Sequence, residues 1–135
     1  MICIVLVGPQ GSGKTTYCKN HLSNYTHINQ DILGKQHWKI FTSEVFIKTP
    51  YIVVDRINHT KNQRKKYLSL AKSNGYKTKI IFLNLSFNVC LKRVLERKNH
   101  PIDNEKTANI AIKTYFKQFE EITEDEADQI IEIRN

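Results

Sequence analysis

The chain begins with an apolar run that leads directly into a glycine-rich octapeptide, and this pair of features constrains the fold most strongly. The run is Ile2–Val7, and the octapeptide, residues 8–15, reads GPQGSGKT. It matches the phosphate-binding P-loop pattern G-x-x-x-x-G-K-[ST] at every fixed position. Glycines let the backbone curl so that its N–H groups point at phosphate oxygens, and the start of the following helix attracts anions. The pattern predicts a strand, a phosphate loop and a helix.

The side chains of this loop have separate expected roles. Lys14 is expected to reach the β- and γ-phosphates of a nucleotide, and the Thr15 hydroxyl to ligate Mg²⁺. ATP and Mg²⁺ are therefore the expected cofactors. The alternative, a glycine-rich turn that holds no nucleotide, is disfavoured by the buried type of the strand before it. The expected nucleotide contacts are Gly8, Gly11, Ser12, Gly13, Lys14, Thr15, Thr16, Arg93 and Arg97.

Length and cysteine content set the class of protein. A chain of 135 residues holds one buried core and is too short for two, so residues 1–135 are expected to form a single domain. No apolar run reaches the length of a membrane span, and the first strand lacks the features of a signal peptide. Cys3, Cys18 and Cys90 are odd in number and widely spaced, which argues against disulfides or a zinc site. We expect an intracellular, reducing compartment, cytoplasmic or nuclear, without membrane contact.

Charge is distributed unevenly along the chain. The net charge is +8, yet residues 1–119 carry twenty bases and six acids, whereas residues 120–135 carry one base and seven acids. The basic part favours phosphate-rich partners such as nucleic acids. A lysine-rich surface that only keeps the protein in solution is the alternative, and charge alone does not separate the two.

Short apolar runs alternate with helical segments, which predicts an α/β fold with a mostly parallel sheet and ligands at the carboxyl ends of the strands. The expected strands are Ile2–Val7, Thr26–Asn29, Tyr51–Asp55, 79–85 and 129–134. The expected helices are 14–22, 31–46, Lys61–Ser73, 87–98 and 104–120. An acidic segment, 120–128, precedes the last strand.

Charged side chains near the expected strand ends suit phosphoryl transfer. Such a site must neutralise the transferred phosphoryl group and hold an acceptor in line with it. Asp31 is the candidate general base, and Asp55 is a candidate for a place near Mg²⁺ or the acceptor hydroxyl. For both, a helix cap or turn role is the alternative. Arg93 and Arg97 are four residues apart, so a helix would place both on one face as a cationic lid or as an ordinary solvated face.

Several motifs in this order resemble the kinase domain of polynucleotide 5′-hydroxyl kinases of the phage and animal types. They are the P-loop, HINQDILG at 27–34, VDRIN at 54–58 with Arg64, Arg93-x-x-x-Arg97, HPI at 100–102, and YFKQFE at 115–120. The resemblance covers nearly the whole chain. It implies a three-layer P-loop kinase fold with a short sheet and a helical lid at about 87–101. It also implies ATP-dependent phosphorylation of the 5′-hydroxyl of DNA or RNA ends.

The resemblance also implies residue roles. Asp31 matches the general base, while Lys14 and Arg97 match residues that contact the transferred phosphates. Asp55 matches an acid near the acceptor and is a second candidate ligand for Mg²⁺. The expected substrate contacts are Asp31, Lys35, Asp55, Asn58 and Arg64.

The chain departs from that family at two positions. Gln30 stands where the family has an arginine before the base, and Gly34 stands where phage-type enzymes have an arginine after it. Lys35 or Arg56 is expected to replace the missing contact with the acceptor phosphate. No phosphatase motif or ligase segment is present in this sequence, so separate phosphatase or ligase proteins are candidate partners.

Other interpretations remain open at this stage. A small-molecule kinase, acting on a nucleotide, shikimate or gluconate, shares the loop and the lid arginines, and a module that binds ATP and nucleic acid without catalysis shares the loop. Trp38 and Phe41 suit a core better than base stacking. The basic start of the third expected helix, with Lys61, Arg64, Lys65 and Lys66, suits either nucleic acid or solvent.

Overall fold

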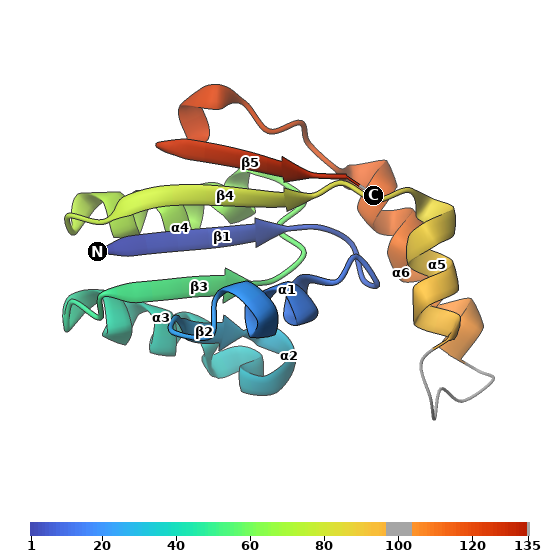
Figure 1. The fold of residues 1–135 in the computed structure, drawn as a ribbon, viewed down its shortest axis with the longest axis horizontal. Coiled ribbons are helices and arrows are strands. Elements are labelled where there is room, and N and C mark those ends of the chain that lie inside the picture. The colour runs from blue at the N-terminus through green and yellow to red at the C-terminus, as the bar shows by residue number, and fades with distance from the viewer. Residues whose placement is uncertain (97–103, 135) are drawn as a thin grey trace.

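A five-stranded parallel sheet forms the centre of the computed structural model, which describes residues 1–96 and 104–134 (Figure 1). The strand order is β2-β3-β1-β4-β5, and each neighbouring pair is parallel. The strands are β1 Ile2–Val7, β2 Thr26–Asn29, β3 Tyr51–Asp55, β4 Lys77–Leu83 and β5 Gln129–Ile133. This arrangement confirms the predicted α/β class and parallel sheet.

Helices connect the strands and cover both faces of the sheet, which gives three layers. They are α1 Lys14–His21, α2 Gln30–Leu33, α3 His37–Phe46, α4 Lys61–Ser73, α5 Phe87–Leu95 and α6 Asn104–Gln118. Two single-turn 3₁₀ helices are η1 Gly34–Gln36 and η2 Glu124–Glu126. In the described part of the chain, no helix is long and apolar enough to cross a membrane.

Several predicted helices end one to three residues earlier in the structure, and two predicted elements differ more. The expected helix 31–46 is divided into α2, η1 and α3, because Gly34 has a φ of 57°, outside the right-handed helical region. The expected strand 79–85 begins two residues earlier, since Lys77 pairs with Ile2 at the start of β1. It ends at Leu83, and Leu85 joins the core of the α5 and α6 pair instead.

Alternation along β1 divides the core between the two faces of the sheet. Cys3, Val5 and Val7 contribute to the cluster under α3 and α4, and Ile4 and Leu6 contribute to the cluster under α1. Because every residue from Cys3 to Val7 is at most 1% exposed, β1 is buried on both faces, as a central parallel strand should be.

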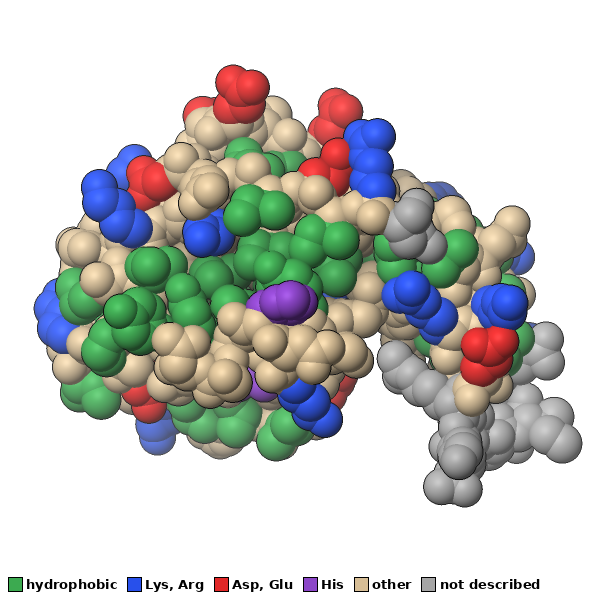
Figure 2. Space-filling view, viewed as in Figure 1, with side chains coloured by type: hydrophobic (Ala, Val, Ile, Leu, Met, Phe, Trp, Pro, Cys, Tyr) green, Lys and Arg blue, Asp and Glu red, His purple; other side chains and the backbone are tan. Residues whose placement is uncertain are grey.

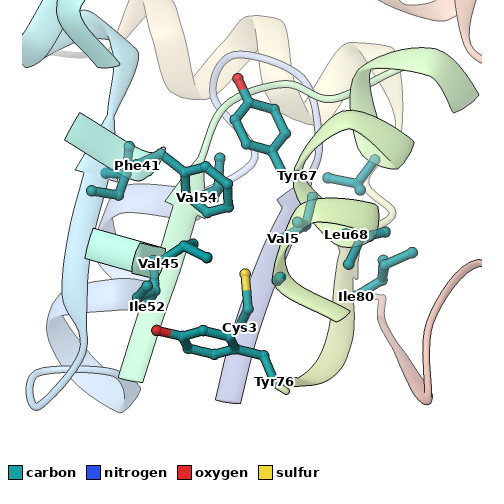
Figure 3. Packing of buried hydrophobic residues seen from close by; sticks show 13 residues of the cluster. Cys3, Val5, Phe41, Val45, Ile52, Val54, Tyr67, Leu68, Tyr76 and Ile80 are labelled. Atoms are coloured by element: carbon teal, nitrogen blue, oxygen red, sulfur yellow. The ribbon is translucent and has the colours of Figure 1, made fainter. Parts of the chain in front are cut away.

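Aromatic side chains fill the cluster under α3 and α4 (Figure 3). Phe41 from α3 and Tyr67 from α4 are fully buried, and their rings meet edge to face at a centroid distance of 5.1 Å. Trp38 is half-buried and contacts both rings. The interpretation of Phe41 and Trp38 as core residues is confirmed, and Trp38 lies at the outer edge of that core.

Helices α5 and α6 pack on each other and extend beyond the carboxyl ends of the strands (Figure 1). Their own small core consists of Leu85, Cys90, Val94, Ala108 and Ile112. Helix α5 occupies the first part of the expected lid, while residues 97–101 of that lid lie outside the described residues. All three cysteines are buried free thiols.

Figure 2 shows one face of the surface, on which Lys and Arg side chains are scattered around the rim instead of gathering in one patch. Apolar side chains occupy the middle of this face. The positive charge of residues 1–119 therefore forms no concentrated patch on this side of the molecule.

Candidate active site

A pocket of about 380 Å³ opens where the P-loop, the ends of β2 and β3, and helix α6 meet. It brings Lys14 and Thr15 of the P-loop together with Asp31 and Asp55, which come from other parts of the chain. Its lining residues are Gln10, Gly11, Gly13, Lys14, Thr15, Thr16, Gln30, Asp31, Asp55, Arg56, Ile57, Ala111 and Tyr115. The carboxyl ends of parallel strands converge here, as expected for the ligand site of such a sheet.

Two glycines of the P-loop occupy positions that no other residue could take without strain. Gly11 and Gly13 have φ values of 83° and 91°, in the left-handed region. A Cβ on Gly11 would stand 2.5 Å from the carbonyl oxygen of Cys90 in α5. The loop is therefore packed directly against the lid helix, and the glycine spacing read from the sequence has a steric cause.

The Lys14 side chain lies back over its own loop. Its Nζ donates hydrogen bonds to the carbonyl oxygens of Gly8, at 2.8 Å, and Pro9, at 3.0 Å. The ammonium group thus lies within the turn of the P-loop and borders the pocket. This position is next to the backbone that the motif assigns to phosphate binding.

Asp55, at the end of β3, is the centre of a polar cluster beneath the loop. Its Oδ2 accepts hydrogen bonds from the Thr15 hydroxyl at 3.0 Å and from Asn29 Nδ2 at 3.2 Å. His27 Nε2 lies 2.9 Å from the same oxygen. Asp55 is 5% exposed, so water has little access to its carboxylate. These three neighbouring groups hold the carboxylate in one place.

The donor set around Asp55 decides which metal ion would fit. Cys18, His27 and Asp55 place their ligand atoms within 4.8 Å of one another. However, burial raises the pKa of the Cys18 thiol to about 12, so the sulfur keeps its proton and is a poor ligand. The Thr15 hydroxyl and Asp55 carboxylate offer the oxygen ligands that Mg²⁺ prefers. These two side chains are the ones that would hold Mg²⁺.

Asn29 fixes the backbone that carries Asp31. Its Oδ1 accepts from the backbone N–H of Asp31 at 2.8 Å and of Ile32 at 3.4 Å, which caps the N-terminus of α2. The capping role, one alternative for Asp31, therefore belongs to Asn29. The Asp31 side chain is exposed and borders the pocket.

A second pocket of about 520 Å³ lies on the other side of the P-loop. It is lined by residues of the loop, of α1 and of the segments after β4 and β5, and Arg93 of α5 borders it. Arg93 Nη1 lies 3.6 Å from the position that a Cβ on Gly13 would take. The structure therefore places Arg93 over the loop, while Arg97 lies outside the described residues.

Arg64 does not lie where a substrate contact requires it. It is fully buried, its Nε forms an ion pair with Glu126 Oε1 at 2.7 Å, and its Nη atoms donate to the carbonyl oxygens of Asn58 and Glu120. The expected nucleic-acid contact of Arg64 is thus wrong for this structure. Arg64 shares the buried stripe of α4 with Tyr67, which explains its inward direction.

Three more expected contacts need revision. Asn58 is 1% exposed, and its Nδ2 donates to the Leu6 carbonyl at 2.8 Å, so it joins the segment after β3 to β1 instead of contacting a substrate. The side chain of Ser12 is 2% exposed and points into the protein, which leaves only its backbone for a nucleotide. Lys35 is exposed in η1 and is absent from the residues that line the described pockets.

The first pocket, which holds Asp31 and Asp55, also contains residues to which the sequence assigned no firm role. Tyr115 and Ala111 of α6 close one side of it, and Gln30 and Arg56 lie beside Asp31. Tyr115 belongs to the YFKQFE motif, but a motif gives no direction for a side chain. His27 next to Asp55 was equally hidden, because it contacts a residue 28 positions away in the chain.

Comparison with known proteins gives partial relatives in sequence. No family model matches the chain. A protein of Acanthamoeba polyphaga mimivirus that is named as a bifunctional polynucleotide phosphatase/kinase is 37% identical over 76 residues, which cover 54% of this chain and 18% of that protein. The chain spans less than a fifth of the length of the curated relatives it matches.

Solved structures resemble the whole described fold. A gluconokinase from Sinorhizobium meliloti gives a TM-score of 0.67 at 16% identity, over 98% of this chain and 81% of that one. The APS kinase CysC from Mycobacterium tuberculosis, solved with AMPPNP and APS, gives 0.62 at 14% identity, over 96% and 87%. At these identities the likeness shows the fold alone. The chain therefore has the three-layer fold of P-loop kinases, as its sequence predicts.

Proposed function

We propose that this chain is an ATP-dependent polynucleotide 5′-hydroxyl kinase. The observation that carries the proposal is that one pocket is lined by Lys14 and Thr15 of the P-loop and by the carboxylates of Asp31 and Asp55. A phosphate loop and a carboxylate that line the same pocket are the two halves that phosphoryl transfer to a hydroxyl requires.

The donor half is the P-loop with the side chains around it. ATP would place its phosphates against the loop backbone and Lys14, with Arg93 covering them from α5. Thr15 and Asp55 would hold Mg²⁺, which neutralises phosphate charge when it is bound. Arg97 would add a second lid cation. The fold supports this half, since structures with the same fold include one solved with the ATP analogue AMPPNP.

The acceptor half is centred on Asp31. Its carboxylate would accept the proton of the 5′-hydroxyl while the hydroxyl oxygen forms a bond to the γ-phosphorus. The bond between that phosphorus and the β,γ-bridging oxygen breaks, and its electron pair leaves with ADP. Exposure of Asp31 at the pocket rim leaves room for an acceptor that continues out of the site, as a nucleic-acid strand must.

Two observations favour a polynucleotide as the acceptor. The mimivirus relative carries polynucleotide kinase in its name, and residues 1–119 carry twenty bases against six acids. Basic proteins bind polyanions through release of counterions. DNA and RNA ends are the proposed partners, with phosphatase or ligase proteins as candidates for the neighbouring steps of end processing.

A small-molecule kinase is the second candidate, because the gluconokinase structure matches the fold over nearly the whole chain. One assay separates the two. The protein is incubated with γ-labelled ATP, Mg²⁺ and four acceptors: a 5′-hydroxyl DNA oligonucleotide, the matching RNA, a mononucleotide and gluconate.

Label on the oligonucleotides supports the proposed function. Label on gluconate or the mononucleotide alone would show that the protein is a small-molecule kinase instead. If no acceptor becomes labelled, a module that binds without catalysis is favoured. The matched control is Lys14→Ala, which removes the loop ammonium and leaves the side chains of the acceptor half unchanged.

A further inference from the structure

The two faces of the sheet are covered unequally. Helices α3 and α4 lie over one face, where α4 contacts both β1 and β4. On the other face α1 contacts β3, and among the described residues no helix lies in front of β4 and β5 in Figure 1. Parallel sheets are normally buried on both faces, because their strands carry apolar side chains on both sides. Part of this sheet therefore lacks its second covering layer.

We call this uncovered part of the sheet the open face. It consists of the side chains of β1, β4 and β5 that point to the α1 side: Ile2, Ile4, Leu6, Lys77, Lys79, Ile81, Leu83, Gln129, Ile131 and Ile133. Ile2, Ile131 and Ile133 remain half-buried although they pack on the buried cluster there. Figure 2 shows apolar side chains across the middle of the molecule from this side. A contiguous apolar surface of this kind marks an interaction site.

Lys79 lies within the open face, between two other strands. In the register of the sheet it is opposite Ile4 of β1 and Gln129 of β5, and Ile81 follows it on the same side of β4. Its side chain is half-buried, and neither Lys79 nor Lys77 forms an ion pair in the described part of the chain. A buried charge without a partner is costly. Whatever covers the open face must therefore bring a carboxylate to Lys79.

The charges of the open face argue against a second copy of this chain as the cover. In a two-fold dimer the same surface meets itself, so Lys77 and Lys79 of both copies would enter one interface. The open face offers these lysines no carboxylate, because its other members are apolar or, at Gln129, neutral. An amphipathic helix presents an apolar stripe flanked by polar edges, and helices are the usual cover of a parallel sheet. A helix with acidic edges fits both the shape and the charge.

We propose that the open face is a docking surface for an amphipathic helix of another protein. The apolar stripe of that helix covers Ile2, Ile131 and Ile133, and carboxylates along its edge pair with Lys77 and Lys79. Burial of the apolar side chains supplies the affinity, and the two lysines select the partner. At the carboxyl ends of the strands the open face meets the second pocket, which Ile133 also lines. The docked helix therefore lies beside the P-loop.

The test uses three designed helical peptides of about 18 residues, or five turns. All three carry the same leucine stripe, and they differ only along its edges, which are glutamate in the first peptide, glutamine in the second and lysine in the third. Each peptide carries a fluorescein label, and fluorescence anisotropy measures its binding to the full chain. Circular dichroism and the urea midpoint show whether each protein variant is folded.

Wild-type protein should bind the glutamate peptide about tenfold more tightly than the glutamine peptide, as expected for a hydrogen-bonded charge pair, and the lysine peptide most weakly. Lys79→Glu should reverse this order. Ile131→Glu, which puts a charge in the apolar middle of the open face, should abolish binding of all three peptides. Lys39→Glu on α3 and Ile110→Glu on α6 are the matched controls, since both side chains are exposed and lie outside the open face. They should retain the wild-type order.

Equal affinity for the glutamate and glutamine peptides, an order that Lys79→Glu leaves unchanged, or no binding at millimolar concentrations would overturn the proposal. Lys79→Glu decides the matter even if Ile131→Glu does not fold. Two other occupants are tested with the protein alone, by sedimentation and with phosphatidylserine vesicles. A dimer that Lys79→Glu or Ile131→Glu dissociates would assign the open face to a second copy, and vesicle binding that these variants lose would assign it to a lipid surface. Either result overturns the helix, and none of these measurements depends on phosphoryl transfer.

Discussion

The two halves of the candidate site are built in different ways. The donor half is centred on one continuous segment, the P-loop of residues 8–15, whose shape follows from its own glycines and from its contact with α5. The acceptor half is assembled from side chains that are distant in the chain, among them Asp31, Arg56 and Tyr115. The function of a continuous segment can be recognised from its sequence, whereas a site assembled from distant residues depends on the fold.

The comparison implies that the halves can be damaged separately. Changes in the acceptor half should affect the transfer step or the choice of acceptor and leave nucleotide binding intact. Changes in the donor half should reduce transfer to every acceptor alike. The substitutions below test this separation.

Asp31→Asn should cause the largest effect. The amide cannot take the proton of the acceptor hydroxyl, so kcat should fall by about 10²–10⁴-fold. The dissociation constant for ATP, measured by calorimetry, should stay unchanged because Asp31 is assigned to the acceptor and not to the phosphates of ATP. Asp125→Asn, at an exposed acid of η2, is the control. Unchanged turnover in Asp31→Asn would remove this residue from the mechanism.

Lys14→Ala should be next in size. Loss of a cation aimed at the transferred phosphates costs about 10²–10³-fold in kcat. Since the donor half serves every acceptor, transfer to oligonucleotides and the background hydrolysis of ATP should fall together. Lys19→Ala, an exposed lysine of the same helix α1, is the control. A loss confined to one acceptor would contradict the assignment of Lys14 to the donor half.

Glu126→Gln tests whether Arg64 belongs to the core and not to the acceptor half. The substitution leaves the buried guanidinium of Arg64 without its counterion, which should lower the free energy of unfolding by on the order of 3 kcal/mol. Urea denaturation measures this loss, and Glu124→Gln is the control in the same turn. An unchanged midpoint would mean that the Arg64 and Glu126 pair adds nothing to the fold.

Arg56→Gln should produce the smallest change, in salt dependence. Each phosphate contact on a single strand contributes a slope of about −0.7 to the plot of log affinity against log salt concentration. Removal of one contact should reduce the slope by that amount, as measured by titrations at several salt concentrations. A slope equal to that of the wild-type protein would place Arg56 away from the strand.

The parts of the fold that depend on a local sequence pattern could be predicted from the sequence. The strands, the P-loop and the boundaries of α4 follow from apolar runs, fixed glycines and a helix start at Thr60, whose hydroxyl accepts from the Gln63 N–H at 3.3 Å. Gly75, with a φ of 87°, lies just after α4, where a glycine commonly ends a helix. The break at Gly34 was missed because a glycine inside a helical pattern is often tolerated.

Tertiary contacts determined the rest. Arg64 looked like part of a basic surface because Lys61 and Lys65 flank it, yet residues 64, 67, 68 and 71 are the buried stripe of α4. That spacing was visible in the sequence. Because it puts Arg64 on the same helix face as the apolar residues, it would have indicated a buried arginine despite the charge of the side chain. The hydrogen bonds that link His37 through Tyr67 to Arg56 had no such signal, since they join residues that are 30 and 11 positions apart.

The most direct measurement of the central claim is transfer from γ-labelled ATP to a pair of oligonucleotides that are identical except at the 5′ end, one with a hydroxyl and one already phosphorylated. A polynucleotide 5′-hydroxyl kinase should put label on the first, released by nuclease digestion only with its 5′-terminal nucleotide, and no label on the second. Equal labelling of both, or label at any other position, would contradict it.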